Sequence, residues 1–124
     1  PEGPSLPPQP PPPASGTPAR LLGRYVRDEK ILPLEEAIRR MTSLPAQQLR
    51  IAERGRLLPG WFADLVVFDP ARVTDRATFE QPHQLAEGVV HVFVNGQAAF
   101  ADGRPTDLRP GRFVRRAGWS PKEP

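Results

Sequence analysis

Proline is distributed very unevenly along this chain of 124 residues, and that limits how much of it can fold. Nine of the 18 prolines fall within residues 1–18, where no apolar residue recurs at helical or strand spacing. Such a segment cannot offset the entropy lost on folding, so we expect it to be extended or disordered. The folding part then lies nearer residues 19–117, which is enough for a small core only.

Composition excludes several classes of protein. No apolar run approaches the roughly 20 residues of a membrane-spanning helix, and the absence of Cys excludes disulfides and thiolate sites. Basic and acidic residues are interleaved, except in one basic cluster made of Arg109, Arg112, Arg115 and Arg116. Because no aromatic residues are regularly spaced around this cluster, we expect neither nucleic-acid nor membrane binding. The composition suits a cytoplasmic protein.

Two stretches are predicted to be helical. Thr17 followed by Pro18 is typical of a helix start, and apolar residues then recur at helical spacing up to residue 26. A second helix is expected from Leu34 to Met41, where four apolar residues share one face. Pro33 precedes this helix and offers no capping oxygen, and one further helical turn is expected after it.

From residue 54 onward the pattern becomes that of strands. Residues 65–68 (LVVF) form a continuous apolar run, which is typical of a strand covered on both faces. Asn95-Gly96 is the strongest hairpin signal in the chain. The other expected elements are strands at 89–94, 97–101 and around 113–114, a turn at 102–103, and a loop at 71–88.

These strands are too few to close a β structure by themselves. The run 65–68 calls for a neighbouring strand on each side, whereas this chain supplies one. The single Met of the chain, Met41, lies inside a predicted helix. We therefore expect a fragment of a longer polypeptide, whose strands complete a sheet built partly by other segments.

The residues of this strand region resemble a known superfamily. Residues 55–69 (GRLLPGWFADLVVFD) and 92–96 (VFVNG) resemble the C-terminal signature of the metal-dependent amidohydrolases. In that superfamily the signature belongs to a β-sandwich assembled from both chain ends beside a (β/α)₈ barrel. Residues 34–46 (LEEAIRRMTSLPA) are similar to the last barrel helix and the turn after it.

Further segments resemble one branch, the N-acyl-D-amino-acid deacylases. They are residues 16–17, 20–27 (RLLGRYVR), 75–84 (DRATFEQPHQ) and 109–112 (RPGR). The resemblance implies an α+β fragment with four regions. These are a disordered Pro-rich segment at 1–18, terminal barrel helices at 19–50, part of the β-sandwich at 51–117, and a disordered tail at 118–124.

The resemblance also implies a reaction for the parent enzyme, which is the hydrolysis of a non-peptide amide to a carboxylate and a D-amino acid. A zinc-activated water and an Asp acting as general acid and base would carry it out. This chain departs from the family where it matters most. Its segment before Gly16 is proline-rich, where the family has a metal-site Asp and a His-Pro-Arg run. Arg50 also replaces a helix-terminating Gly.

The chain itself lacks the residues for this chemistry. Its two histidines, His83 and His91, lie eight residues apart and form no zinc-binding motif. We expect no catalytic, metal-binding or cofactor-binding residue here and no zinc bound to this chain alone. His83, in a polar loop, is the one candidate for a contact at the mouth of the parent's active site.

The other candidate residues have simpler interpretations. His91 alternates with valines on a predicted strand, and Asp64 and Asp69 bracket another strand, so structural and boundary roles are expected. Lys30 stands in charge-rich surroundings that do not suit a carboxylated, metal-bridging lysine.

The expected partners of the chain are the remainder of the parent polypeptide and, in that parent, a small N-acyl amino acid. Two alternatives stay open. Residues 1–18 contain a minimal P-x-x-P spacing, so the chain could be a Pro-rich interaction module. It could also be the nonfunctional product of a truncated gene.

Overall fold

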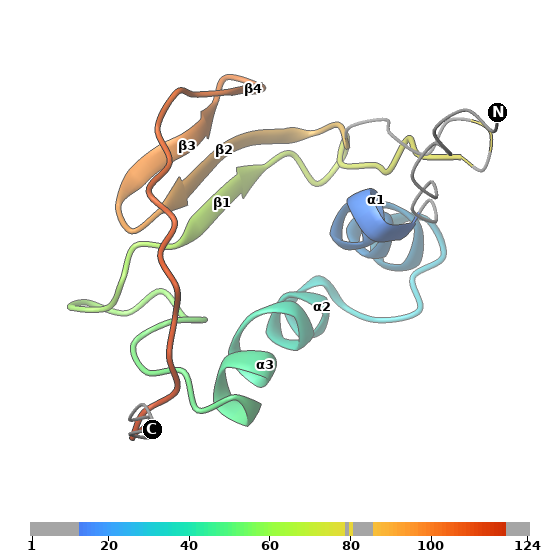
Figure 1. The fold of residues 1–124 in the computed structure, drawn as a ribbon. Helices are drawn as coiled ribbons and strands as arrows, with labels where there is room; N and C mark the ends of the chain where they lie inside the picture. Colours follow the sequence, from blue (N-terminus) through green and yellow to red (C-terminus); the bar gives the residue numbers. More distant parts are fainter. Residues whose placement is uncertain (1–12, 79, 81–85, 119–124) are drawn as a thin grey trace, which may run out of the picture.

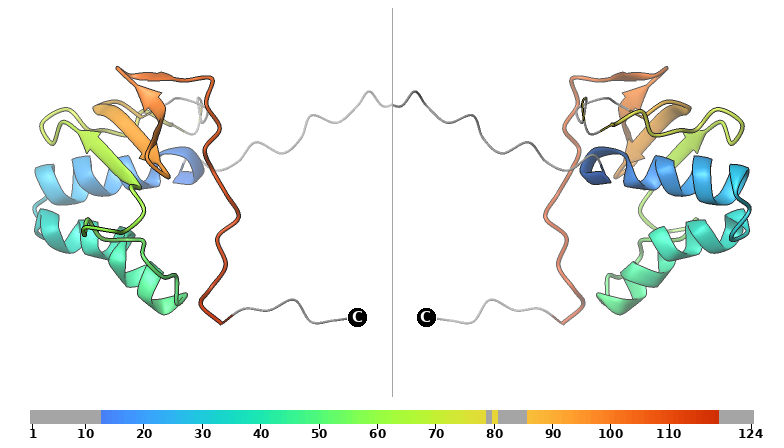
Figure 2. Two further views of the ribbon diagram at one scale, coloured as in Figure 1. Left: turned by 90° about the vertical axis from the view of Figure 1, so that its left-hand side faces the viewer. Right: turned by 90° about the vertical axis from the view of Figure 1, so that its right-hand side faces the viewer.

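A computed structural model describes residues 13–78, 80 and 86–118, and it places a helical part beside a single antiparallel sheet (Figure 1). In chain order the elements are α1 (Pro13–Arg20), η1 (Leu21–Asp28), α2 (Leu34–Met41), α3 (Ser43–Gln48), β1 (Leu65–Phe68), β2 (Val89–Val94), β3 (Gln97–Ala101) and β4 (Arg104–Pro105). The expected order of helices followed by antiparallel strands is therefore confirmed. In the side views, α1 and η1 lie between the sheet and the pair α2–α3 (Figure 2).

The first helix begins earlier than the sequence predicted. It starts at Pro13, so Thr17 and Pro18 lie inside it and do not form its start. A proline fits the first helical turn because its missing N–H would be unpaired there anyway. Pro18 removes one further donor inside the helix. The chain then continues into η1, a π-helix, whose end is marked by the bond from the Glu29 N–H to the Arg24 carbonyl, 2.8 Å.

The ends of α2 and α3 follow the chemistry of their flanking residues. Pro33 is the N-cap of α2 and makes no side-chain capping bond, as predicted. Helix α3 ends in a Schellman motif, in which the N–H of Ile51 bonds the Ala46 carbonyl at 2.8 Å and that of Arg50 bonds Gln47 at 3.1 Å. This motif needs a left-handed residue, and Arg50 supplies it with φ 54°.

The sheet has the strand order β1-β2-β3-β4, and all its pairs are antiparallel. Both predicted hairpin turns are present. Asn95 and Gly96 have φ values of 51° and 78°, and Asp102 and Gly103 have 50° and 75°. Two consecutive positive φ values define the type I′ turn, whose twist matches that of the two strands it joins.

Strand β1 is less covered than the sequence predicted. Val66 and Val67 point to opposite faces of the sheet, and they are 53% and 44% exposed. The expectation of cover on both faces is wrong for this chain, because among the described residues both faces of β1 stay open at these valines, and β1 is also the edge strand of the sheet, paired with β2. The single neighbour that the sequence predicted for it is confirmed.

The buried core lies on the helical side of the molecule. It consists of Ala19, Leu22, Ala37 and Val73. Val73 is 2% exposed and belongs to the segment that was predicted to be a loop. Phe68 at the end of β1 packs against this core, so one aromatic side chain of the strand contributes to it.

After β4 the chain runs back beside the sheet towards the end of α3 (Figure 1). The Ala117 N–H bonds the Arg50 carbonyl at 2.9 Å. The short strand expected around residues 113–114 is not formed. Phe113 is 84% exposed, and the described part of the sheet ends instead with β4, directly after the second turn.

Candidate functional site

The chemistry-bearing residues that the sequence singled out are not gathered in one place. His83 lies outside the described residues, so its predicted contact at an active-site mouth stays a prediction. Within the described residues, no three His, Asp or Glu side chains come together in a way that could hold a metal ion. Lys30 is exposed, in the left-handed region just after η1, with φ 52°.

The remaining candidates occupy structural positions. His91 lies in β2, and its Nδ1 accepts a bond from the N–H of Asp102 at 3.3 Å, in the β3–β4 turn. Asp69 follows directly after β1, and its side chain accepts from the N–H of Ala71 at 2.9 Å, which is a local turn contact. Both residues therefore have the structural and boundary roles that the sequence predicted.

A polar network joins the segment before β1 to the β2–β3 turn. Its centre is Arg54, whose side chain is 13% exposed, pairs with Asp64 and donates to Asn95 Oδ1 at 2.5 Å. The guanidinium also lies 4.0 Å from the ring centre of Phe62. Asp64 in turn accepts from the N–H of Asn95 at 2.8 Å.

The same asparagine reaches the C-terminal segment, because its Nδ2 donates to the Pro110 carbonyl at 2.7 Å. Asn95 thus has two roles, one in the hairpin turn and one in holding residue 110 beside it. Sequence patterns identify the turn role from Asn-Gly alone. They contain no signal for the contact with Arg54, which lies 41 positions away.

A second polar cluster lies on α1. The Asp75 side chain is 2% exposed and pairs with Arg20, whose Nη2 lies 2.7 Å from Asp75 Oδ2. Arg20 also donates to the Ala77 carbonyl at 3.2 Å, and Asp75 Oδ1 accepts from the Ala77 N–H at 2.9 Å. The buried carboxylate is thus matched by a cation and a backbone donor.

Further along the chain, in η1, Arg27 contacts the same segment. Its Nη1 donates to the carbonyls of Val73 at 2.8 Å and Ala71 at 3.1 Å, and its Nε donates to Asp28 at 2.7 Å. That hydrogen bond lowers the pKa of Asp28. Gly23 lies between these contacts, and a Cβ there would come within 2.4 Å of the Val73 carbonyl. The backbone of residues 71–77 is therefore seated closely on the helix.

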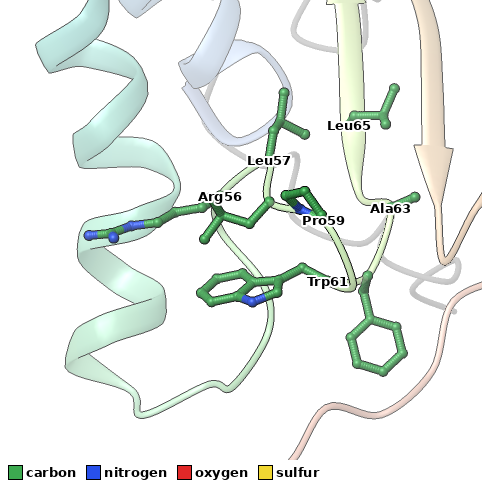
Figure 3. Close-up of a pocket in the computed structure, with 8 residues that line it drawn as sticks. Arg56, Leu57, Pro59, Trp61, Ala63 and Leu65 are labelled. Carbon is green, nitrogen blue, oxygen red and sulfur yellow. The ribbon is translucent and has the colours of Figure 1, made fainter.

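An apolar hollow of about 300 Å³ lies beside the start of β1. Figure 3 shows Leu57, Pro59 and Trp61 around it, while the side chain of Arg56 extends away towards the helices. Leu57 is 77% exposed, so the hollow is a shallow surface feature. It offers apolar contact area without a polar group positioned for chemistry.

Comparison with protein families decides the class of the chain. Residues 10–100 match the model of the amidohydrolase family. The chain belongs to the amidohydrolase family. This bears out the resemblance found in residues 55–69 and 92–96.

Relatives within the family are deacylases of D-amino acid derivatives. The chain is 50% identical over 101 residues to an N-acyl-D-glutamate deacylase of Alcaligenes xylosoxydans xylosoxydans, covering 82% of this chain and 20% of that protein. It is 48% identical over 101 residues to a D-aminoacylase of the same organism, covering 82% and 21%. The chain thus spans about a fifth of the length of these relatives.

Solved structures give the same result for the fold. A crystal structure of a D-aminoacylase superposes with a TM-score of 0.79 at 50% identity, covering 82% of this chain and 21% of that one. An N-acyl-D-glutamate deacylase of Bordetella bronchiseptica, complexed with zinc and a phosphonate inhibitor, gives 0.65 at 52% identity, covering 70% and 19%. No described helix of the present chain is long and apolar enough to span a membrane.

Proposed function

We propose that this chain is the C-terminal part of a zinc-dependent N-acyl-D-amino-acid deacylase. The parent enzyme hydrolyses the amide bond between an acyl group and a D-amino acid, and water supplies the oxygen of the released carboxylate. The observation that carries the proposal is the match to a D-aminoacylase structure at 50% identity over 82% of this chain.

The residues described here do not fit a zinc site of their own. No three potential ligands are near one another, and the ring of His91 is already bonded to a turn. The zinc ligands and the catalytic acid–base group would therefore come from the remainder of the polypeptide. In this proposal the chain contributes structure: its helices are outer helices of the barrel, and its strands are one part of a β-sandwich.

The open surface of β1 supports this structural role. An edge strand with exposed valines on both faces is an interaction surface that a stable monomer normally protects. We assign the remainder of the parent polypeptide as the partner that covers it. The contact of His83 with the mouth of the parent's active site and the region boundaries at residues 50 and 117 belong to the same proposal, whereas the first boundary moves from residue 18 because α1 already begins at Pro13.

A chimera tests the proposal directly. Residues 16–116 would replace the matching segment of the Alcaligenes D-aminoacylase, and hydrolysis of N-acetyl-D-amino acids would be measured, with the L-enantiomers as controls. We expect a folded chimera that binds zinc and acts on D-substrates, while the 124-residue chain alone is inactive. Zinc binding with deacylase activity in the isolated chain, or a folded chimera without activity, would contradict the proposal.

A further inference from the structure

The segment that follows β1 forms a loop with a closed neck. The backbone N–H of Thr74 bonds the Glu87 carbonyl at 3.2 Å, and that of Glu87 bonds the Thr74 carbonyl at 2.9 Å. An ion pair of 2.7 Å between Arg76 and Glu87 lies beside this bridge. We call residues 73–77 and 86–88 the neck, because the Thr74–Glu87 bridge holds these two backbone segments side by side.

The neck is fixed on α1 through one buried carboxylate. Asp75 is a residue of the neck whose side chain forms an ion pair with α1, and this side chain is 2% exposed against 32% for Arg20. The Arg20 guanidinium contacts both Asp75 and the Ala77 carbonyl, so one planar group holds two points of the neck. An ion pair whose carboxylate is buried, and whose two carboxylate oxygens both accept hydrogen bonds, differs from the exposed pairs that contribute little.

Gly16 provides the space for this carboxylate. A Cβ built on Gly16 would lie 1.9 Å from Asp75 Oδ1 and 2.1 Å from its Cγ, closer than any real contact. Gly16 has no positive φ among the backbone angles of this structure, so turn geometry does not explain it. The missing side chain at position 16 is explained by the Asp75 carboxylate that lies against it.

We propose that Arg20 and Asp75 are positioning residues, which together with Gly16 set where the neck sits on α1. The pair acts locally: it determines where residues 75–77 lie on α1 and, through the bridge between Thr74 and Glu87, where residues 86–88 lie. It is distinct from the contacts of Arg27 in η1, which hold the carbonyl of Ala71, before the neck, and that of Val73, the first residue of the neck. This inference is independent of the proposed deacylase reaction.

Residue-resolved hydrogen exchange of the 124-residue chain tests the pair. In Arg20→Ala we expect the amides of Thr74, Ala77 and Glu87 to exchange about tenfold faster, while those of the β2–β3 hairpin are unchanged. Arg24→Ala is the matched control, because Arg24 lies on the same helix and pairs with Glu29, away from the neck. Arg20→Lys keeps the positive charge but lacks the planar guanidinium that donates to two acceptors, so its neck amides should exchange more slowly than those of Arg20→Ala and faster than those of the unmodified chain.

A substitution at Gly16 gives a second test, because the change in exchange rate that we expect is opposite to the usual effect of replacing Gly with Ala in a helix. Replacing a helical Gly with Ala ordinarily slows local opening roughly fivefold, because Ala is the better helix former. Here we expect Gly16→Ala to speed exchange at the neck about tenfold, and to cease doing so in an Asp75→Ala background. Faster exchange over the whole chain, unchanged neck amides in Arg20→Ala, or slower exchange in Gly16→Ala would overturn the proposal.

Discussion

At the scale of single residues, Arg50 occupies a position that suits glycine. It closes the Schellman motif of α3 with φ 54°, where a Cβ crowds the neighbouring carbonyl at a cost of roughly 1–2 kcal/mol. We predict that Arg50→Gly stabilises the end of α3 by about 1 kcal/mol, which is less than this cost because Gly also loses more entropy on folding. The measurement is exchange of the Ile51 amide, which should slow roughly fivefold.

Arg50→Ala serves as the control for that prediction. It removes the same side-chain charge but keeps the Cβ, so exchange at Ile51 should stay close to that of the unmodified chain. If both variants slowed exchange equally, the cause would be loss of the arginine side chain and not relief of the backbone.

A comparison of the Asn95-Gly96 turn with the Arg20–Asp75 ion pair shows which contacts can be predicted from sequence. Asn95-Gly96 predicted its own turn, because both residues that need positive φ are adjacent in the chain. Arg20 and Asp75 lie 55 positions apart, and each is an ordinary charged residue in its local pattern. Their pairing depends on how α1 packs against the segment after β1, and a local pattern carries no information about that packing.

At the scale of one element, α2 carries a local charge network. Arg39 donates to Glu36 at 2.7 Å and Arg40 donates at 2.7 Å, and these bonds lower the pKa of Glu36 from about 4.5 to about 2. A carboxylate whose pKa is lowered by folding stabilises the folded state above its unfolded pKa. We therefore predict that this contribution is lost as the pH falls from about 4.5 to about 2.

Far-UV circular dichroism against pH measures this effect, with Glu36→Gln as the test variant. Its curve should be flatter between pH 4.5 and 2 than that of the unmodified chain, and its helix signal lower at pH 7. Glu35→Gln is the control, since Glu35 lies in the same first turn and is exposed. Equal flattening by both substitutions would show that the helix dipole is responsible and not the arginine pairs.

The elements also show where sequence reasoning about the fold fails. The start of α1 was placed at Thr17-Pro18, a good local signal, but the helix extends back to Pro13. Strand β1 was predicted to be buried because its residues are all apolar. An apolar run indicates that a strand is suited to burial, but it does not show whether this chain contains the segments that would cover it. The loop predicted at 71–88 has no helix or strand in its described part, but the burial of Val73 was not predicted, because a single buried residue in an irregular segment gives no periodic pattern.

At the scale of the whole molecule, the core and the sheet are largely separate. The residues of the core cluster belong to α1, η1, α2 and the segment at Val73, whereas no residue of β2 or β3 is fully buried. A core of this size stabilises the helical side and the turn of chain packed on it. The sheet depends on hairpin bonds and on whatever covers β1, so its stability is tied to the partner surface.

Because the sheet is separate from the core, we predict that charges placed on β1 have opposite effects in the isolated chain and in the chimera. Val66→Lys with Val67→Lys places charge on both faces of β1, and edge-strand charges suppress pairing between chains. In the isolated chain we expect less concentration-dependent aggregation, measured by light scattering, because both valines are already exposed. In the D-aminoacylase chimera the same lysines would be buried without partners, so folded yield and D-substrate hydrolysis should fall.

Leu108→Lys is the control, since Leu108 is equally exposed but lies outside the sheet. A chimera that tolerates the lysines on β1 would show that this strand is not the contact surface, whereas a loss confined to the β1 variant would place the remainder of the polypeptide against it.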